Sequence, residues 1–127
     1  MDLREKSICL LASVAAVDMQ TEANKEVLFT VPAGKAAIIT HVVVRNPTLT
    51  LATCDDCDLG IGALCDTWKQ SNNFSTLVAA TDFMVITSDN TMYAVLNAAE
   101  VFGIYVVSGS AAAATATIDV FGYLYDE

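Results

Sequence analysis

The stretch VLFTVPAGKAAIITHVVVRN, residues 27–46, decides the fold class. Apolar and other side chains alternate through residues 27–31, which is the period-two pattern of a β-strand. Pro32 presets the backbone angle that opens a turn, and Gly34 accepts the left-handed conformation that closes one. A second strand follows at residues 35–46. We therefore expect a β-hairpin with Pro32 and Gly34 as its structural turn.

The second of these strands is apolar on both faces. An unbroken alternation places Ile38, Val42 and Val44 on one face, and Ile39, His41, Val43 and Arg45 on the other. A strand of this kind should lie centrally in a sheet or under a subunit contact. Pro47 ends it, because proline has no N–H to donate to a sheet ladder.

Further strands are predicted from the same alternating pattern and from turn residues. A second hairpin is expected in FMVITSDNTMYAVL, where strands at 83–87 and 92–96 flank a turn at 88–91. Other predicted strands cover residues 8–17, 58–63, 102–108 and 115–125. About eight strands joined by short turns predict an all-β fold, a single antiparallel β-sandwich of jelly-roll type, with an up-and-down β-barrel as the alternative.

The length of 127 residues fits one domain. We expect a β-sandwich domain at residues 25–127, preceded by an N-terminal strand or arm at residues 1–24. Ser13-Val14-Ala15 resembles the cleavage site of a secretory signal, but Asp2 and Glu5 cancel the basic charge of the leader. The apolar run at 8–17 is also too short for a bilayer, which needs about 20 residues. We interpret it as an uncleaved structural segment, with no membrane partner.

Composition indicates a protein partner. Hydrophobic residues make up 54% and charged residues 17%, against roughly 45–50% and about 25% in ordinary soluble domains. Such a chain is expected to hide surface in a homo-oligomer or against another protein. Fifteen acids against six bases give a formal charge of -9, which argues against nucleic-acid binding.

The segment TCDDCDLGIGALCD, residues 53–66, holds three of the four cysteines. Cys54 and Cys57 have the spacing of a zinc knuckle, Cys65 is a candidate third ligand, and Cys9 or His41 a fourth. A second closely spaced ligand pair is missing, and neighbouring carboxylates raise thiol pKa values. A metal ion, a local disulfide and free thiols all remain open, with free thiols preferred and no cofactor expected.

Catalytic patterns are absent from the sequence. His41 is the one histidine and lies within a predicted strand, and no G-x-S-x-G pattern occurs. Lys35 follows Gly34 without the glycine-rich arc of a phosphate loop. We therefore expect a protein that is not an enzyme, with Trp68, Tyr123 and Tyr125 as candidate contact aromatics.

Two segments together resemble a known class of proteins. VLFTVPAGKAAIITHVVVRNP (27–47) and FGIYVVSGSAAAATATIDVFGYLYD (102–126) are similar to stretches of small structural proteins of tailed bacteriophages, and they cover less than half of the chain. The resemblance implies a capsid decoration or cement protein, often trimeric, that binds the outside of the assembled shell and stabilises it. Its partners would be the major capsid protein or other virion subunits. The protein would be made in the host cytoplasm and located at the capsid surface of the virion.

Two other functions stay open. One is a phage tail or fibre module that binds a receptor or glycan. The other is a small metal-binding or lectin-like cellular β-sandwich protein. If the chain is a capsid decoration protein, we expect residues 1–24 to form an arm that reaches the shell or a neighbouring subunit. Deleting the arm should abolish capsid binding and leave the sandwich folded.

Overall fold

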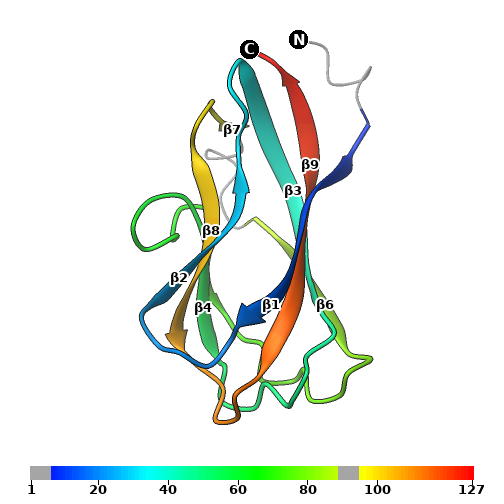
Figure 1. Ribbon diagram of the computed structural model, residues 1–127, viewed down its shortest axis with the longest axis vertical. Helices are drawn as coiled ribbons and strands as arrows, with labels where there is room; N and C mark the ends of the chain where they lie inside the picture. Colours follow the sequence, from blue (N-terminus) through cyan, green and yellow to red (C-terminus); the bar gives the residue numbers. More distant parts are fainter. Residues whose placement is uncertain (1–6, 89–94) are drawn as a thin grey trace.

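The computed structural model describes residues 7–88 and 95–127, and the strands in those residues are shown in Figure 1. They are β1 (Cys9–Asp18), β2 (Asn24–Thr30), β3 (Lys35–Arg45), β4 (Asp56–Gly60), β5 (Lys69–Asn72), β6 (Phe83–Thr87), β7 (Val95–Leu96), β8 (Val101–Ser108) and β9 (Thr115–Asp126). The described part of the chain contains no helix, and therefore none able to cross a membrane.

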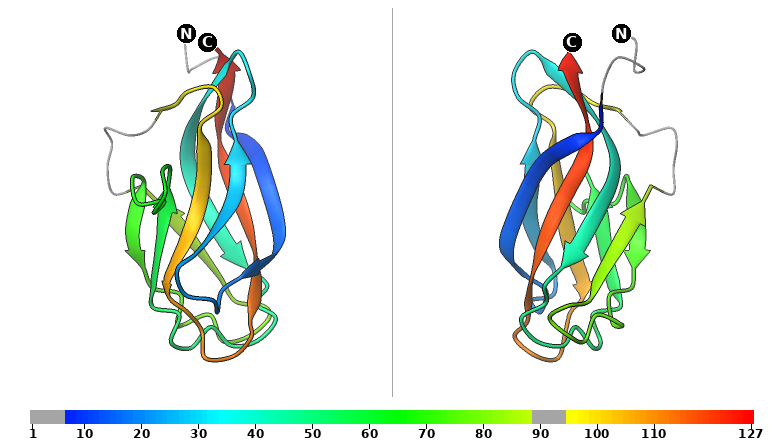
Figure 2. Two further views of the ribbon diagram at one scale, coloured as in Figure 1. Left: turned by 60° about the vertical axis from the view of Figure 1, so that its left-hand side comes forward. Right: turned by 90° about the vertical axis from the view of Figure 1, so that its right-hand side faces the viewer.

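The strands form two antiparallel sheets, as the sequence predicted. The five-stranded sheet has the order β1-β9-β3-β6, and β7 also pairs with β3. The four-stranded sheet has the order β2-β8-β4-β5. In the right-hand view of Figure 2, β1, β9, β3 and β6 lie side by side in that order, with the other sheet behind them.

The turn after β2 does not close a hairpin, so that prediction was wrong. Lys35 N donates to Pro32 O at 3.2 Å and Gly34 has φ +74°, which is a tight turn at the expected place. However, β2 pairs with β8, whereas β3 pairs with β9, β6 and β7. The turn therefore carries the chain from one sheet to the other, and apart from β4 and β5 the consecutive strands are not the neighbours that an up-and-down arrangement requires.

The second predicted hairpin is also wrong. Both β6 and β7 pair antiparallel with β3, with His41 opposite Thr87 and Ala37 opposite Leu96. The two strands follow one another along the same edge of β3 instead of facing each other. The turn predicted at 88–91 and the start of the strand predicted at 92–96 fall largely at 89–94, outside the described residues.

A bulge in β3 changes which side chains share a face. The pairing between β3 and β9 shifts between Ile39 and His41, so one extra residue is accommodated at Thr40. Ile39 therefore joins the inward-facing Val42, and Ile38 joins the outward-facing His41. This exchange corrects the assignment of Ile38 and Ile39 that strict alternation gave.

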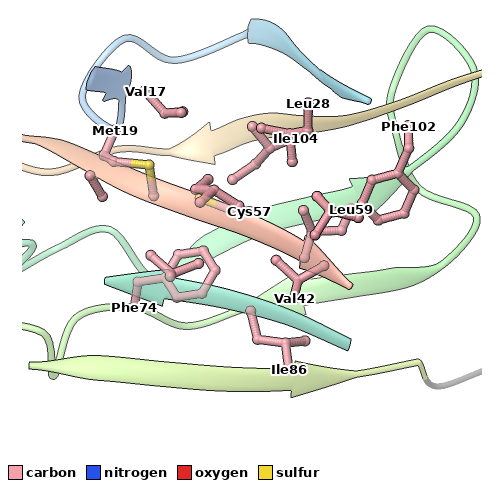
Figure 3. Close-up of a cluster of buried hydrophobic side chains, with 14 of the residues drawn as sticks. Val17, Met19, Leu28, Val42, Cys57, Leu59, Phe74, Ile86, Phe102 and Ile104 are labelled. Carbon is pink, nitrogen blue, oxygen red and sulfur yellow. The ribbon is translucent and has the colours of Figure 1, made fainter. Parts of the chain in front are cut away.

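The core lies between the two sheets. Side chains from both layers meet there, as Figure 3 shows for Val42 and Ile86 from one sheet and Leu59, Phe102 and Ile104 from the other. Residues 9–18, expected as a strand or an arm, form β1, which pairs with β9 from Cys9 opposite Gly122 to Asp18 opposite Thr115.

The loops at one end of the sandwich are joined by backbone hydrogen bonds. Met19 N donates to Ala114 O at 3.1 Å, and Ser110 N donates back to Met19 O at 2.9 Å. Phe74 N donates to Cys54 O at 2.9 Å, which connects the loops before β4 and after β5. These bonds close the end of the core that contains the Cys54 segment.

Candidate functional site

Side chains on the outward side of the five-stranded sheet form a continuous surface. The register pairs Ile38 with Tyr123 and Val95, His41 with Phe121 and Thr87, and Val43 with Asp119 and Val85. Residues directly opposite each other in a sheet point to the same face. We call this surface the outer face; its members from β1, β3, β6, β7 and β9 are Leu10, Ser13, Ile38, His41, Val43, Arg45, Phe83, Val85, Thr87, Val95, Asp119, Phe121 and Tyr123.

The outer face carries large apolar side chains in contact with solvent. The exposed fraction is 67% for Phe83, 54% for Val85, 53% for Leu10 and 49% for Val95. Exposed apolar side chains grouped in this way mark sites of protein contact, whereas isolated ones need no explanation. The arrangement therefore indicates a contact surface.

A polar cluster lies in the middle of this apolar surface. Asp119 on β9 accepts hydrogen bonds from Ser13 Oγ at 2.6 Å and from Arg45 Nε at 2.7 Å. Burial raises the pKa of Asp119, but the hydrogen bonds from Arg45 and Ser13 outweigh it, so the pKa lies below its ordinary value. The carboxylate is thus held ionised and connects β1, β9 and β3 across the face.

His41 belongs to the outer face. Its ring stacks on Phe121 with centroids 4.6 Å apart and planes inclined by 6°. Its Nδ1 lies 3.0 Å from Thr40 Oγ1. Because it points away from the core, His41 cannot join Cys54 and Cys57, which are buried between the sheets.

The three aromatic residues predicted as contacts lie in different places. Tyr123 and Tyr125 are half-buried on β9, and Tyr123 is part of the outer face. Trp68 is 2% exposed, packs edge-on against Phe102 and donates its indole N–H to Ile39 O at 3.3 Å. Trp68 is therefore a core residue, and its role as a surface contact was wrongly predicted.

The cysteines divide into a pair and two separate residues. Cys54 Sγ and Cys57 Sγ are 3.5 Å apart and both residues are fully buried. Cys65 lies beside Gly103, three residues from the β8 position opposite Cys57, a separation of roughly 10 Å along the strand. Cys9 is exposed on β1.

The proposed four-ligand metal set is consequently not assembled. Within residues 7–88 and 95–127, no group of three or more histidine, cysteine or acidic side chains is placed to hold a metal ion. A hydrogen bond also links the two paired thiols. The hydrogen bond from Cys57 lowers the pKa of Cys54, whereas that bond and burial raise the pKa of Cys57.

A cleft of about 330 Å³ lies between β5 and β6, at the open edges of the two sheets. Lys69 and Asn72 line one side, and Met84 and Ile86 line the other. The sequence did not reveal it, because nothing in either short strand shows that the two edges meet. The outer face as a whole was also not predicted from the sequence. Arg45 and Asp119 were a usable signal of it, because each is a charged residue within an otherwise apolar strand.

Comparisons with known proteins locate the fold. No protein-family model matches the chain, and no curated protein matches it. Among solved structures, a chain described as the capsid asymmetric unit of cyanophage Pam1 is similar, with a TM-score of 0.58. The two chains share a fold. The similarity covers 93% of this chain and 85% of that chain at 13% sequence identity, so it concerns the fold alone.

Proposed function

We propose that this chain is a virion structural protein of the capsid decoration or cement type, which binds the outside of the assembled shell. The observation that carries the proposal is the outer face, a surface with exposed Phe83 and Val85 on a chain of charge -9. Such a surface fits a protein partner better than a nucleic acid. The similarity to a phage capsid chain supports a capsid subunit as that partner.

The strand order supports the jelly-roll assignment within this proposal. If β6 and β7 are counted as one interrupted strand, eight strands divide equally between the two sheets. The chain then changes sheet at every connection except that between β4 and β5. Eight strands in two sheets with such crossings are the arrangement of a double-sheet jelly roll.

The role is mechanical and does not involve catalysis. Each contact would contribute on the order of 25 cal/mol per Å² of buried apolar area, before association costs are subtracted. A homotrimer would multiply that contribution, because each copy brings its own outer face to a shell subunit or to a neighbouring copy. Repeated over a lattice, the contacts would stabilise the shell.

Electron cryomicroscopy of particles made with this chain tests the proposal. We expect density for the sandwich on the outer surface of the capsid lattice, with the five-stranded sheet against a neighbouring subunit. Density confined to the tail, or particles without the chain, would reject the decoration role.

A matched set of variants tests which surface is used. Val85→Lys places a charge in the outer face at a position that also lines the cleft between β5 and β6, so Leu10→Lys repeats the test on β1, away from the cleft. Val78→Lys is the control, because it changes a valine of similar exposure, 56% against 54%, in the loop between β5 and β6. We expect Val85→Lys and Leu10→Lys to reduce occupancy of the particle at least tenfold and Val78→Lys to leave it unchanged. Equal occupancy for all three variants would remove the outer face from the proposal.

The cleft between β5 and β6 favours a second candidate, a tail or fibre module that binds a glycan. Ser71 and Asn73 are exposed and line the cleft with a hydroxyl and an amide group, which are suited to sugar hydroxyls. Trp68 is buried and so cannot test glycan binding. Asn73→Ala is the informative variant, because Asn73 lines the cleft and is exposed. Glycan-array binding that this variant abolishes would establish the second candidate.

A further inference from the structure

Two thiols, those of Cys54 and Cys57, approach each other within the core. Their sulfur atoms are 3.5 Å apart, and only two residues separate them in the chain. Both lie at the closed end of the sandwich, where Cys57 is seen among the core side chains in Figure 3. From this geometry we propose that Cys54 and Cys57 form a redox-active dithiol that closes to a disulfide by exchange with a small uncharged disulfide.

The backbone around the pair keeps the two thiols together. Cys54 N donates to Leu51 O at 2.9 Å, and Cys54 O accepts from Phe74 N at 2.9 Å. Cys57 lies in β4 opposite Asn72, whose side-chain amide donates to Cys57 O at 2.9 Å. Bond formation therefore needs only a small approach of the sulfur atoms within a fixed segment.

The order of the chemical steps follows from where the two residues lie. Cys54 attacks first, because it lies in the loop between the exposed Thr53 and Asp55, whereas Cys57 lies within β4. The Cys54 thiolate attacks one sulfur of the reagent, forming a mixed disulfide and releasing one thiolate, which takes up a proton. Cys57 then attacks Cys54 Sγ, and its proton passes to the departing sulfur, which leaves as a second thiol. Two protein thiols are oxidised and one reagent disulfide is reduced to two thiols.

Access and charge decide which reagent reacts. Cys54 is fully buried and its neighbours Thr53 and Asp55 are exposed, so this loop must open and break the backbone hydrogen bonds of Cys54 before a reagent reaches the sulfur. Asp55 follows Cys54 directly in the chain, and Asp56 and Asp58 flank Cys57. These carboxylates repel an anionic disulfide, so an uncharged reagent should react several times faster than oxidised glutathione.

The test uses the purified full chain carrying Cys9→Ser and Cys65→Ser, which leaves the pair intact and removes the other two thiols. After incubation with bis(2-hydroxyethyl) disulfide, we expect an intact mass lower by two hydrogen atoms. Peptide mapping should place the bond between Cys54 and Cys57. We also expect the oxidised protein to melt about 5 °C higher than the reduced one, because the bond restricts the unfolded chain.

Three outcomes would overturn the inference. The first is a folded chain that stays reduced while the same chain in urea oxidises fully. The second is a stable mixed disulfide that never resolves, and the third is a lower melting temperature after oxidation. The inference is independent of the proposed function, because it concerns the isolated protein and no particle is involved.

Discussion

At the scale of single residues, Gly122 shows how one missing side chain sets the register of a sheet. It lies on β9 opposite Ile39, beside the bulge of β3. A Cβ atom at this position would stand 2.0 Å from the carbonyl oxygen of Ile38. We expect Gly122→Ala to lower the free energy of unfolding by about 3 kcal/mol, because backbone must move to relieve the clash. Urea denaturation measures this loss.

Gly34→Ala is the control for that substitution. Gly34 has φ +74° but no atom within 4 Å of an added Cβ, so only the backbone conformation is penalised. The expected loss is about 1 kcal/mol. If the two variants lose the same stability, the close approach at Gly122 does not determine the register.

A second single residue, Asp119, makes the free energy of unfolding depend on pH. Burial raises its pKa, but Arg45 and Ser13 bring it below the ordinary value. A carboxyl group with a lowered folded pKa contributes stability that is complete above its unfolded pKa of about 3.9 and is lost as pH falls through the folded pKa. We expect Asp119→Asn to cost about 1 kcal/mol at pH 7, discounted for the partly exposed Arg45 side chain. The cost should shrink as pH falls below about 4, because the carboxyl group becomes protonated.

The comparison must be made as a difference between the two proteins at each pH. Asp18 has a pKa lowered by the Thr21 hydroxyl and adds to the loss in acid, whereas Asp58 has a pKa raised mainly by burial and acts in the opposite direction. Both are unchanged in the variant, so they cancel. A gap between wild type and Asp119→Asn that stays constant down to pH 2 would show that the carboxylate contributes no ionised contact.

At the scale of elements, the sequence located strands far better than it located their partners. Alternation and turn residues placed the strands near β2 and β3, because both signals are local. Pairing is decided by which edges meet in the folded core, and the same turn at Pro32 and Gly34 can join neighbours or two sheets. The bulge at Thr40 was invisible for a related reason, since one extra residue leaves the composition of the strand unchanged.

The strand β1 gives a prediction that opposes the arm interpretation. It pairs with β9 along most of its length and places Val17 in the core, fully buried. Deleting residues 1–18 would leave a long edge of β9 unpaired and open the core beside Met19. We expect the truncated chain to be unfolded or aggregated by circular dichroism and gel filtration.

A milder variant separates loss of the strand from loss of a contact. Ser13→Ala removes the hydroxyl that donates to Asp119 but keeps the strand, so the protein should stay folded and lose about 1 kcal/mol. If the truncated chain instead remained folded and soluble, residues 1–18 would be an arm and the pairing with β9 would be dispensable.

At the scale of the whole molecule, the contact surface was only partly foreseeable. Tyr123 and Trp68 were both chosen from the sequence as aromatic rings able to contact a partner; Tyr123 lies on the outer face, but Trp68 is buried. Leu10 and Phe83 belong to the contact surface because β1 and β6 lie at opposite edges of the same sheet, and the sequence does not show that placement. Exposure is a property of the assembled sandwich, and single strands do not reveal which of their faces is covered.

Charge and apolar area together predict how the protein associates with itself. Copies that each carry a formal charge of -9 repel one another, and the repulsion extends about 30 Å at 0.01 M salt but about 8 Å at 0.15 M. If a trimer forms through the outer face, salt should therefore strengthen it, and sedimentation velocity should show a larger trimer fraction at 0.15 M than at 0.01 M. Val85→Lys should yield monomer at both salt concentrations, and Val78→Lys should behave as wild type. A trimer that dissociates as salt is added would mean that ion pairs, and not the apolar outer face, hold the copies together.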